Sequence, residues 1–147
     1  MLIRTNSENL DFQNLVIELD KDLAIRDGEI HSFYAQFNKI AAIKYVIVAY
    51  ENEMAVGCGA IKEYNADTME VKRMYVEIKN REKGIARMIL KELENWAKEL
   101  GYKKLVLETG NKQPEALHLY KSSRFNVMEN YGQYAGLNTS ICFYKEF

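Results

Sequence analysis

The sequence has little of the residues that cross-link small domains or bind metals. Its 147 residues include two cysteines and two histidines. Cys58 and Cys142 lie far apart and form no CxxC pair, so we expect no disulfide framework and a reducing, cytoplasmic setting. His31 and His118 are too isolated to build a metal site, and no metal is therefore expected.

The chain also lacks long apolar runs and a strong charge of either sign. Its longest apolar stretch, residues 45–50, is far too short to span a bilayer, and the N-terminus lacks the pattern of a signal peptide. A formal net charge of −1 gives no general attraction to nucleic acid or to an anionic membrane. We therefore expect a soluble, cytoplasmic protein that binds neither, while a homodimer is left open.

Linkers, internal repeats and low-complexity tracts are absent as well. With one proline and eight glycines, no stretch of the sequence marks a domain boundary. Domains typically run to about 100–150 residues, which matches the length of this chain. Residues 1–147 are therefore predicted to form a single domain.

The hydrophobic pattern predicts an alternation of strands and helices. After a short strand at 2–5, Asn6 or Ser7 is expected to cap the first helix. The most regular helix covers 85–100, where apolar residues recur every three or four positions, and Gly101 ends it. The first helix is expected to end near Gly28, and two more helices are expected at 31–40 and 114–122. The remaining strands are expected at 44–51, 55–64, 68–77, 103–109, 125–128 and 140–146.

This order, β-α-α-β-β-β-α-β-α-β-β, indicates an α/β (α+β) fold in which helices cover both faces of a mixed sheet. The three strands within 44–77 are expected to form an antiparallel meander. Successive side chains of a strand point to opposite faces. The third strand is therefore predicted to place Glu70, Lys72, Met74 and Val76 on one face, and Val71, Arg73 and Tyr75 on the other.

A basic turn between the third strand and the most regular helix has the features of a phosphate-binding site. Residues 72–87 hold six basic and two acidic side chains. The first N–H groups of a helix lack intrahelical acceptors, and the helix dipole makes that end positive. Gly84 removes the side chain where a phosphate would approach, while Arg81, Lys83 and Arg87 add charge. The spacing alone fits a basic helix start with a chance glycine equally well.

Two motifs in this context resemble those of one enzyme family. Arg81-x-x-Gly84-x-Ala86, which follows a strand and opens a long helix, is similar to the acetyl-CoA motif Q/R-x-x-G-x-G/A of the GNAT N-acetyltransferases. The segment 116–120, Ala-Leu-His-Leu-Tyr, followed by Phe125, resembles that family's A-x-x-x-Y-x-x-x-G-F signature. The order of elements also matches over nearly the whole chain. The resemblance implies a GNAT-type mixed, mostly antiparallel central sheet flanked by helices.

The chain departs from the family pattern at three positions. Glu82 stands where relatives often carry glycine, which places a carboxylate near the expected phosphates. Arg124 replaces the glycine that usually precedes Phe125, and we expect that turn to differ from the family's. Gln113 occupies a place where asparagine is common, and Asn111 lies close enough to substitute for it.

The resemblance implies an enzyme that moves acetyl from acetyl-CoA to a primary amine of a small molecule by direct attack in a ternary complex. Tyr120 would protonate the departing thiolate, and Glu70 would accept the amine proton, with Glu108 or a water chain as the alternatives. An acyl-CoA-binding sensor with little turnover and a protein N-acetylase stay open. The residues expected to bind the cofactor are Met74, Tyr75, Val76, Arg81, Lys83, Gly84, Ile85, Ala86, Arg87, Asn111 and Gln113.

Other distinctive residues are expected to have structural roles. Cys58 lies in an apolar strand and should be buried, whereas His118 should lie at the surface. The aromatic segment 131–134 either lines the acceptor pocket or packs on the sheet as a turn. The resemblance places the aromatic residues of 31–40 on the acceptor side.

Overall fold

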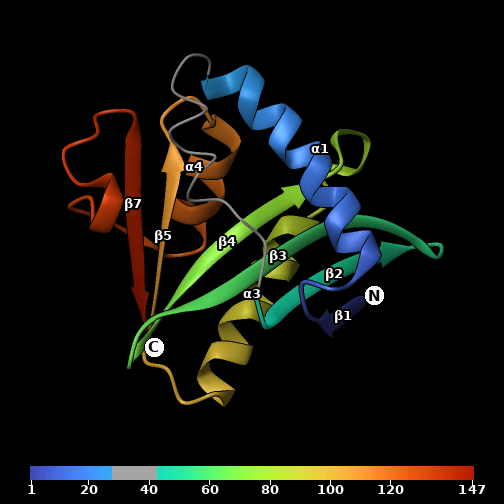
Figure 1. The fold of residues 1–147 in the computed structure, drawn as a ribbon, viewed down its shortest axis with the longest axis horizontal. Helices are drawn as coiled ribbons and strands as arrows, with labels where there is room; N and C mark the ends of the chain where they lie inside the picture. The colour runs from blue at the N-terminus through green and yellow to red at the C-terminus, as the bar shows by residue number, and fades with distance from the viewer. Residues whose placement is uncertain (28–42) are drawn as a thin grey trace.

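Seven β-strands form one mixed sheet in the described part of the chain, residues 1–27 and 43–147 of a computed structural model. The strands lie in the order β1-β2-β3-β4-β5-β7-β6, and every neighbouring pair is antiparallel except β4 and β5 (Figure 1). Their bounds are β1 Leu2–Thr5, β2 Tyr45–Glu51, β3 Met54–Asn65, β4 Thr68–Val76, β5 Lys104–Gly110, β6 Asn126–Met128 and β7 Ser140–Glu146.

Helices cover both faces of this sheet, as the sequence predicts. Helix α1, Leu10–Asp27, crosses one face, and α3, Ile85–Glu99, packs on the other (Figure 1). Helix α4, Pro114–Ser122, follows β5, and two single 3-10 turns, η2 and η3, cover Ile78–Asn80 and Gly132–Tyr134. The predicted order of elements is confirmed, but the helix expected at 31–40 falls outside the described residues. No helix in the described ranges is long and apolar enough to cross a membrane.

Each helix buries its own apolar core against the sheet. Ile89 and Leu93 of α3 are fully buried against strand residues on one side, and Phe12 of α1 is fully buried on the other. Complete burial of one such side chain stabilises the fold by about 1.5–3 kcal/mol. Helix α3 lies so close to β3 that a Cβ on Gly59 would meet the side chains of Ile89 at 2.8 Å and Leu93 at 3.0 Å. Glycine at this position therefore allows the close approach of α3.

The first helix begins later than its predicted caps. The side chain of Asn9, directly before α1, accepts a 2.9 Å hydrogen bond from the backbone N–H of Phe12. Asn6 instead accepts from the N–H of Glu8 and closes a local turn. The prediction of Asn6 or Ser7 as the cap is thus wrong, because three residues that can cap a helix follow β1 within four positions and the sequence pattern does not rank them.

A β-bulge in β4 overturns the predicted assignment of its faces. The β3–β4 register shifts between Cys58 and Ala60, and Arg73 opposite this point has a left-handed φ of 59°. After the bulge, Met74 joins Met69 in the core beneath α3. The alternation therefore breaks: Met74 and Val76 share a face with Met69 and Val71, whereas Glu70, Lys72, Arg73 and Tyr75 lie on the α1 face.

Strands β4 and β5 separate after a short parallel contact. They pair only between Thr68–Glu70 and Lys104–Val106, and beyond it the two ribbons diverge (Figure 1). Among the described strands, none pairs with the β5-facing edge of β4 from Val71 onward. Its backbone N–H and C=O groups need other partners, because buried backbone polar groups are almost always hydrogen-bonded. The separation opens the space in which the functional site lies.

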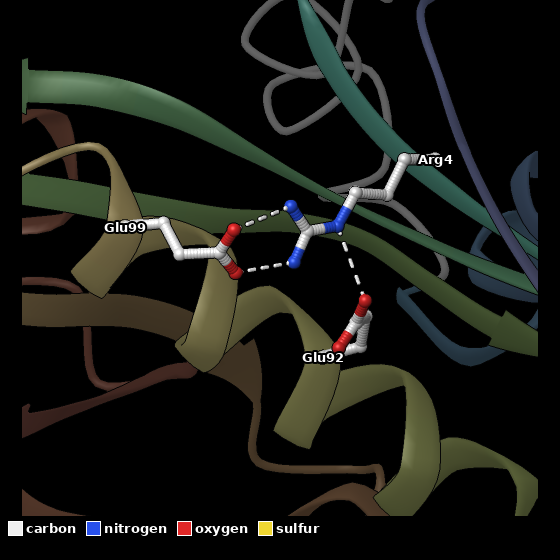
Figure 2. A network of polar contacts seen from close by, with 3 residues as sticks. All are labelled: Arg4, Glu92 and Glu99. Carbon is white, nitrogen blue, oxygen red and sulfur yellow. Dashed lines mark hydrogen bonds and ion pairs between the residues drawn. The ribbon is translucent and has the colours of Figure 1, made fainter.

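The edge strand β1 is tied to α3 by a surface network far from that space. Arg4 donates two hydrogen bonds to the Glu99 carboxylate, at 3.0 and 2.6 Å, and one to Glu92 at 3.1 Å (Figure 2). Its guanidinium also lies over the Trp96 ring, 4.8 Å from the centroid. Exposed pairs of this kind contribute about 0.2–1 kcal/mol each.

Candidate active site

A cavity of about 510 Å³ lies between the diverging strands. Its walls come from β4, the start of α3, the end of β5, α4 and the C-terminal half of α1. The structure places eleven of the predicted site residues on these walls, and Lys83 and Asn111 outside them. The eleven are Glu70, Met74, Tyr75, Val76, Arg81, Gly84, Ile85, Ala86, Arg87, Gln113 and Tyr120.

The start of α3 offers unpaired donors at one end of the cavity. Gly84 is the N-cap with a left-handed φ of 79°, and its carbonyl accepts the first helical bond from Met88. The N–H groups of Ile85, Ala86 and Arg87 therefore have no acceptor within the helix, and the N-cap residue, a glycine, has no side chain to accept from them. The helix dipole adds positive partial charge at the same point. This geometry suits an anion such as a phosphate.

Arg81 is held under this loop by three contacts. Its Nε donates to the carbonyl of Val76 at 2.8 Å, and its guanidinium lies 5.6 Å from the Tyr75 ring centroid. Its Nη2 lies 3.8 Å from the carboxylate of Asp22 on α1. The charge of Arg81 is thus fixed beside the end of β4, where it can attract a phosphate to the cavity wall.

The other basic residues of the predicted motif point elsewhere. The Lys83 ammonium donates to the Asn80 side chain at 3.1 Å and lies 3.5 Å from Glu51, outside the cavity. Arg87 donates to the hydroxyls of Ser122 and Ser123, which ties α3 to the end of α4. The Lys83 side chain is thus directed away from the cavity, while Arg87 both lines the cavity and braces α4.

Glu82 lies on the cavity wall in a strained backbone conformation. Its φ is 65°, in the left-handed region that glycine adopts freely and that costs other L-residues about 1–2 kcal/mol. The departure from the family pattern at this position therefore has two physical consequences. It adds backbone strain to the loop and an exposed carboxylate beside the anion-binding donors.

Helix α4 ends in a Schellman motif that fixes Tyr120. The N–H of Phe125 donates to the Tyr120 carbonyl at 3.0 Å, and that of Arg124 donates to Lys121. Arg124 supplies the required left-handed residue, with φ of 70°, although it is not glycine. The Phe125 ring packs edge-on against Tyr120 with centroids 5.8 Å apart, and Phe143 contacts Tyr120 at the same distance. The spacing of Tyr120 and Phe125 is thus that of a helix C-cap.

Tyr120 is a buried phenol on the cavity wall. Only 5% of the residue is exposed, and burial raises its pKa well above the ordinary value of 10, with a smaller contribution from the charge of Glu108. The hydroxyl therefore stays protonated at neutral pH. A protonated phenol aimed at the cavity can donate a hydrogen bond or a proton to a bound group.

Glu70 is buried on the α1 face and engaged by an aromatic loop. Tyr131 donates a 2.6 Å hydrogen bond to one carboxylate oxygen, and the Lys72 ammonium lies 3.8 Å from the other. Burial and the negative charge of Glu70 raise the pKa of Tyr131, and burial lowers that of Lys72. Tyr134 lines the cavity from the same loop. The 131–134 segment therefore both packs on the sheet and borders the cavity.

The remaining candidates also occupy defined positions. Glu108 lines the cavity and accepts a 2.7 Å hydrogen bond from Ser140. Asn111 donates to the backbone carbonyl of Asn138, away from the cavity. Cys58 is completely buried, as predicted, and burial raises its pKa to about 12. His118 is exposed, as predicted, at the rim of the cavity.

The sequence of this chain is similar to those of known acetyltransferases. Residues 13–125 match the acetyltransferase (GNAT) family. An IAA acetyltransferase from Azospirillum brasilense is 30% identical over 130 residues, which cover 83% of this chain and 84% of that protein.

Solved structures share the fold at lower sequence identity. A Klebsiella pneumoniae protein described as an acyl-CoA N-acyltransferase superposes with a TM-score of 0.82 at 21% identity, over 99% of this chain and 96% of that chain. The PaiA N-acetyltransferase of Thermoplasma acidophilum, solved with coenzyme A, superposes with a TM-score of 0.75 at 16% identity, over 100% and 98%. With more than half of its sequence matched, this chain belongs to the acetyltransferase (GNAT) family and is an N-acetyltransferase.

Proposed function

We propose that residues 1–147 act as one domain that transfers acetyl from acetyl-CoA to the primary amine of a small molecule, by direct attack in a ternary complex. The observation that carries the proposal is the single cavity wall joining the free N–H groups of α3, the open edge of β4 and the Tyr120 hydroxyl. Enclosure of the site between α1, α4 and the 131–134 loop favours a small acceptor over a protein chain.

The residues present fit the parts of the donor. The first-turn amides of Ile85, Ala86 and Arg87, with the charge of Arg81, suit the pyrophosphate. The open backbone edge of β4 between Val71 and Val76 suits an extended arm that carries amide groups, because such an arm can pair with it like a strand. When bound, acetyl-CoA supplies the acetyl group as a thioester.

The chain's own groups supply the proton transfers. Glu70 lies on the α1 face and would accept the proton that the amine loses as its nitrogen bonds to the acetyl carbon. Tyr120 would donate to the sulfur as the carbon–sulfur bond breaks, because the thiolate leaves more easily when protonated. Tyr131 orients Glu70 through the 2.6 Å hydrogen bond to one carboxylate oxygen, and the acceptor amine would approach the other oxygen, which lies 3.8 Å from the Lys72 ammonium.

The experiment follows free thiol released from acetyl-CoA with a panel of small amines, amino acids and peptides. The proposal predicts release that depends on a small-molecule acceptor. Binding is measured in parallel as thermal stabilisation, since a ligand at 100 times its Kd stabilises a protein by about 2.7 kcal/mol. Stabilisation with no thiol release from any acceptor would show a sensor, and release with peptides alone would show a protein acetylase. Arg4→Gln, in the remote network of Figure 2, serves as the control variant.

A further inference from the structure

Arg73 is a buried cation in the cavity whose hydrogen bonding is incomplete. Its side chain is 5% exposed, and it lines the cavity from the centre of β4. The Nη1 group donates to the carboxylate of Asp20 on α1 at 2.7 Å. The Nε–H is buried and has no hydrogen-bond partner among residues 1–27 and 43–147. Leaving such a donor unpaired costs about 1–3 kcal/mol, and more for a charged group, so this group calls for an explanation.

The unpaired donor belongs to a bidentate edge of the guanidinium. A guanidinium presents its N–H groups in a rigid fork, and the Nε and Nη2 hydrogens point the same way. Asp20 accepts from Nη1, so it does not engage the edge that contains the unpaired Nε. Two parallel N–H donors of this kind match the two oxygens of a carboxylate. The orphaned edge therefore has the shape of a carboxylate receptor.

The backbone of β4 is distorted in the way that presents this edge. Arg73 has a φ of 59°, which costs a residue other than glycine about 1–2 kcal/mol. The bulge turns Arg73 and Lys72 to the same face, although neighbours on a regular strand face opposite sides. Strain of this kind persists at sites where it has a use. Here it brings a second positive charge beside Lys72 on the α1 face.

The position of Arg73 along β4 indicates that its guanidinium faces the acceptor rather than the phosphates of the donor. Arg73 lies between Glu70 and Val76 along β4, three residues from each. The phosphate donors of α3 and Arg81 lie beyond Val76, and Arg73 faces α1 together with Glu70. A group held by Arg73 would thus lie on the side from which the amine reaches Glu70.

We propose that Arg73 binds a carboxylate of the acceptor through its Nε and Nη2 edge, so that the physiological acceptor is an amino acid or a similar amine bearing a free carboxylate. This inference rests on the proposed function, because it assigns the acceptor of that same site. The competing assignment for the orphaned edge is a carbonyl of the donor's extended arm, and the test separates the two.

The test compares each L-amino acid with its own amide as acceptor in the thiol-release assay. The amine is kept while the carboxylate is removed, so the pair isolates the carboxylate contact. The wild type is expected to prefer the acids by roughly tenfold or more in kcat/KM, as a charge-assisted bidentate pair implies. Arg73→Lys keeps the charge but loses the fork, and is expected to lose most of that preference with the KM for acetyl-CoA unchanged. Arg4→Gln should retain the wild-type preference.

Each other outcome counts against the inference. Equal use of acids and amides by the wild type, or a preference retained in Arg73→Lys, would overturn it while leaving the proposed function in place. A raised KM for acetyl-CoA in Arg73→Lys, with the preference intact, would assign the edge to the donor. No release with any amine would instead refute the proposed function. If Arg73→Lys does not fold, the wild-type comparison and the thermal shift with acid or amide in the presence of coenzyme A still decide the question.

Discussion

Replacement of Glu82 by glycine is expected to improve both stability and cofactor affinity. Glu82 has a left-handed φ of 65° and an exposed carboxylate on the wall that carries the anion-binding donors. Glycine relieves the strain and removes the charge together. Glu82→Gln removes the charge but keeps the strain. The pair of variants therefore separates the two effects.

The size of the stability effect follows from the backbone. Relief of about 1–2 kcal/mol of left-handed strain is offset by about 0.5–1 kcal/mol of extra chain entropy in the unfolded glycine variant. The net gain of about 0.5–1 kcal/mol raises Tm by about 1–4 °C for a chain of this size. Arg124→Gly is the matched control, because Arg124 has a similar φ of 70° but lies off the cavity wall.

The size of the affinity effect follows from Coulomb's law. One carboxylate about 8 Å from two phosphate charges in water repels them by about 1 kcal/mol, which salt screening reduces by about half. Both Glu82 variants should therefore bind acetyl-CoA about two- to fivefold more tightly, as measured by calorimetric titration. Arg124→Gly should gain stability alone. The reasoning is refuted if Glu82→Gly is no more stable than Glu82→Gln, or if neither variant changes the Kd.

Three further predictions follow from the same contacts. Tyr120→Phe removes the proton donor and should lower kcat by about 100-fold. The ring still packs on Phe125 and Phe143, so Tm and the KM for acetyl-CoA should be nearly unchanged. An unaltered kcat would show that Tyr120 takes no part in the chemistry. Above pH 10 the unfolded chain loses the Tyr120 proton while the folded chain keeps it, because burial raises the pKa in the fold. The free energy of unfolding should thus fall with rising pH, by up to about 1.4 kcal/mol per pH unit for this group, and less steeply in Tyr120→Phe; equal slopes in urea titrations would contradict this. Gly59→Ala places a Cβ 2.5 Å from the Met74 sulfur and 2.8 Å from Ile89, so urea unfolding should show a loss of about 1–3 kcal/mol, and wild-type stability would show that α3 shifts freely.

The local signals in the sequence were sufficient for the order of the described elements and for the glycine-containing turn that begins α3. The apolar period of α3, the glycine at its start and the proline at the start of α4 each act within a few residues, so pattern alone locates them. The pairing of Tyr120 with Phe125 is local as well, because a Schellman motif spans six residues. These features needed no knowledge of the rest of the chain.

The acceptor side of the site depends on contacts that no local pattern contains. The bulge at Arg73 interrupts the alternation of side chains along β4, and no glycine in the sequence marks it. Because of this bulge, Met74 and Val76 lie on the opposite face of the sheet from the one predicted. The bond from Tyr131 to Glu70 joins residues 61 positions apart. Tyr131 was part of a recognisable aromatic loop, but its partner follows only from the packing of that loop on the sheet.

The most direct test of the account is an amide NMR titration of the whole chain with coenzyme A. The backbone N–H signals of Ile85, Ala86 and Arg87, which have no acceptor within α3, should shift most strongly, together with those on the open edge of β4 from Val71 to Val76. Shifts confined to another surface, with the first turn of α3 unchanged, would contradict the assignment of the cleft between β4 and β5 as the acetyl-CoA site.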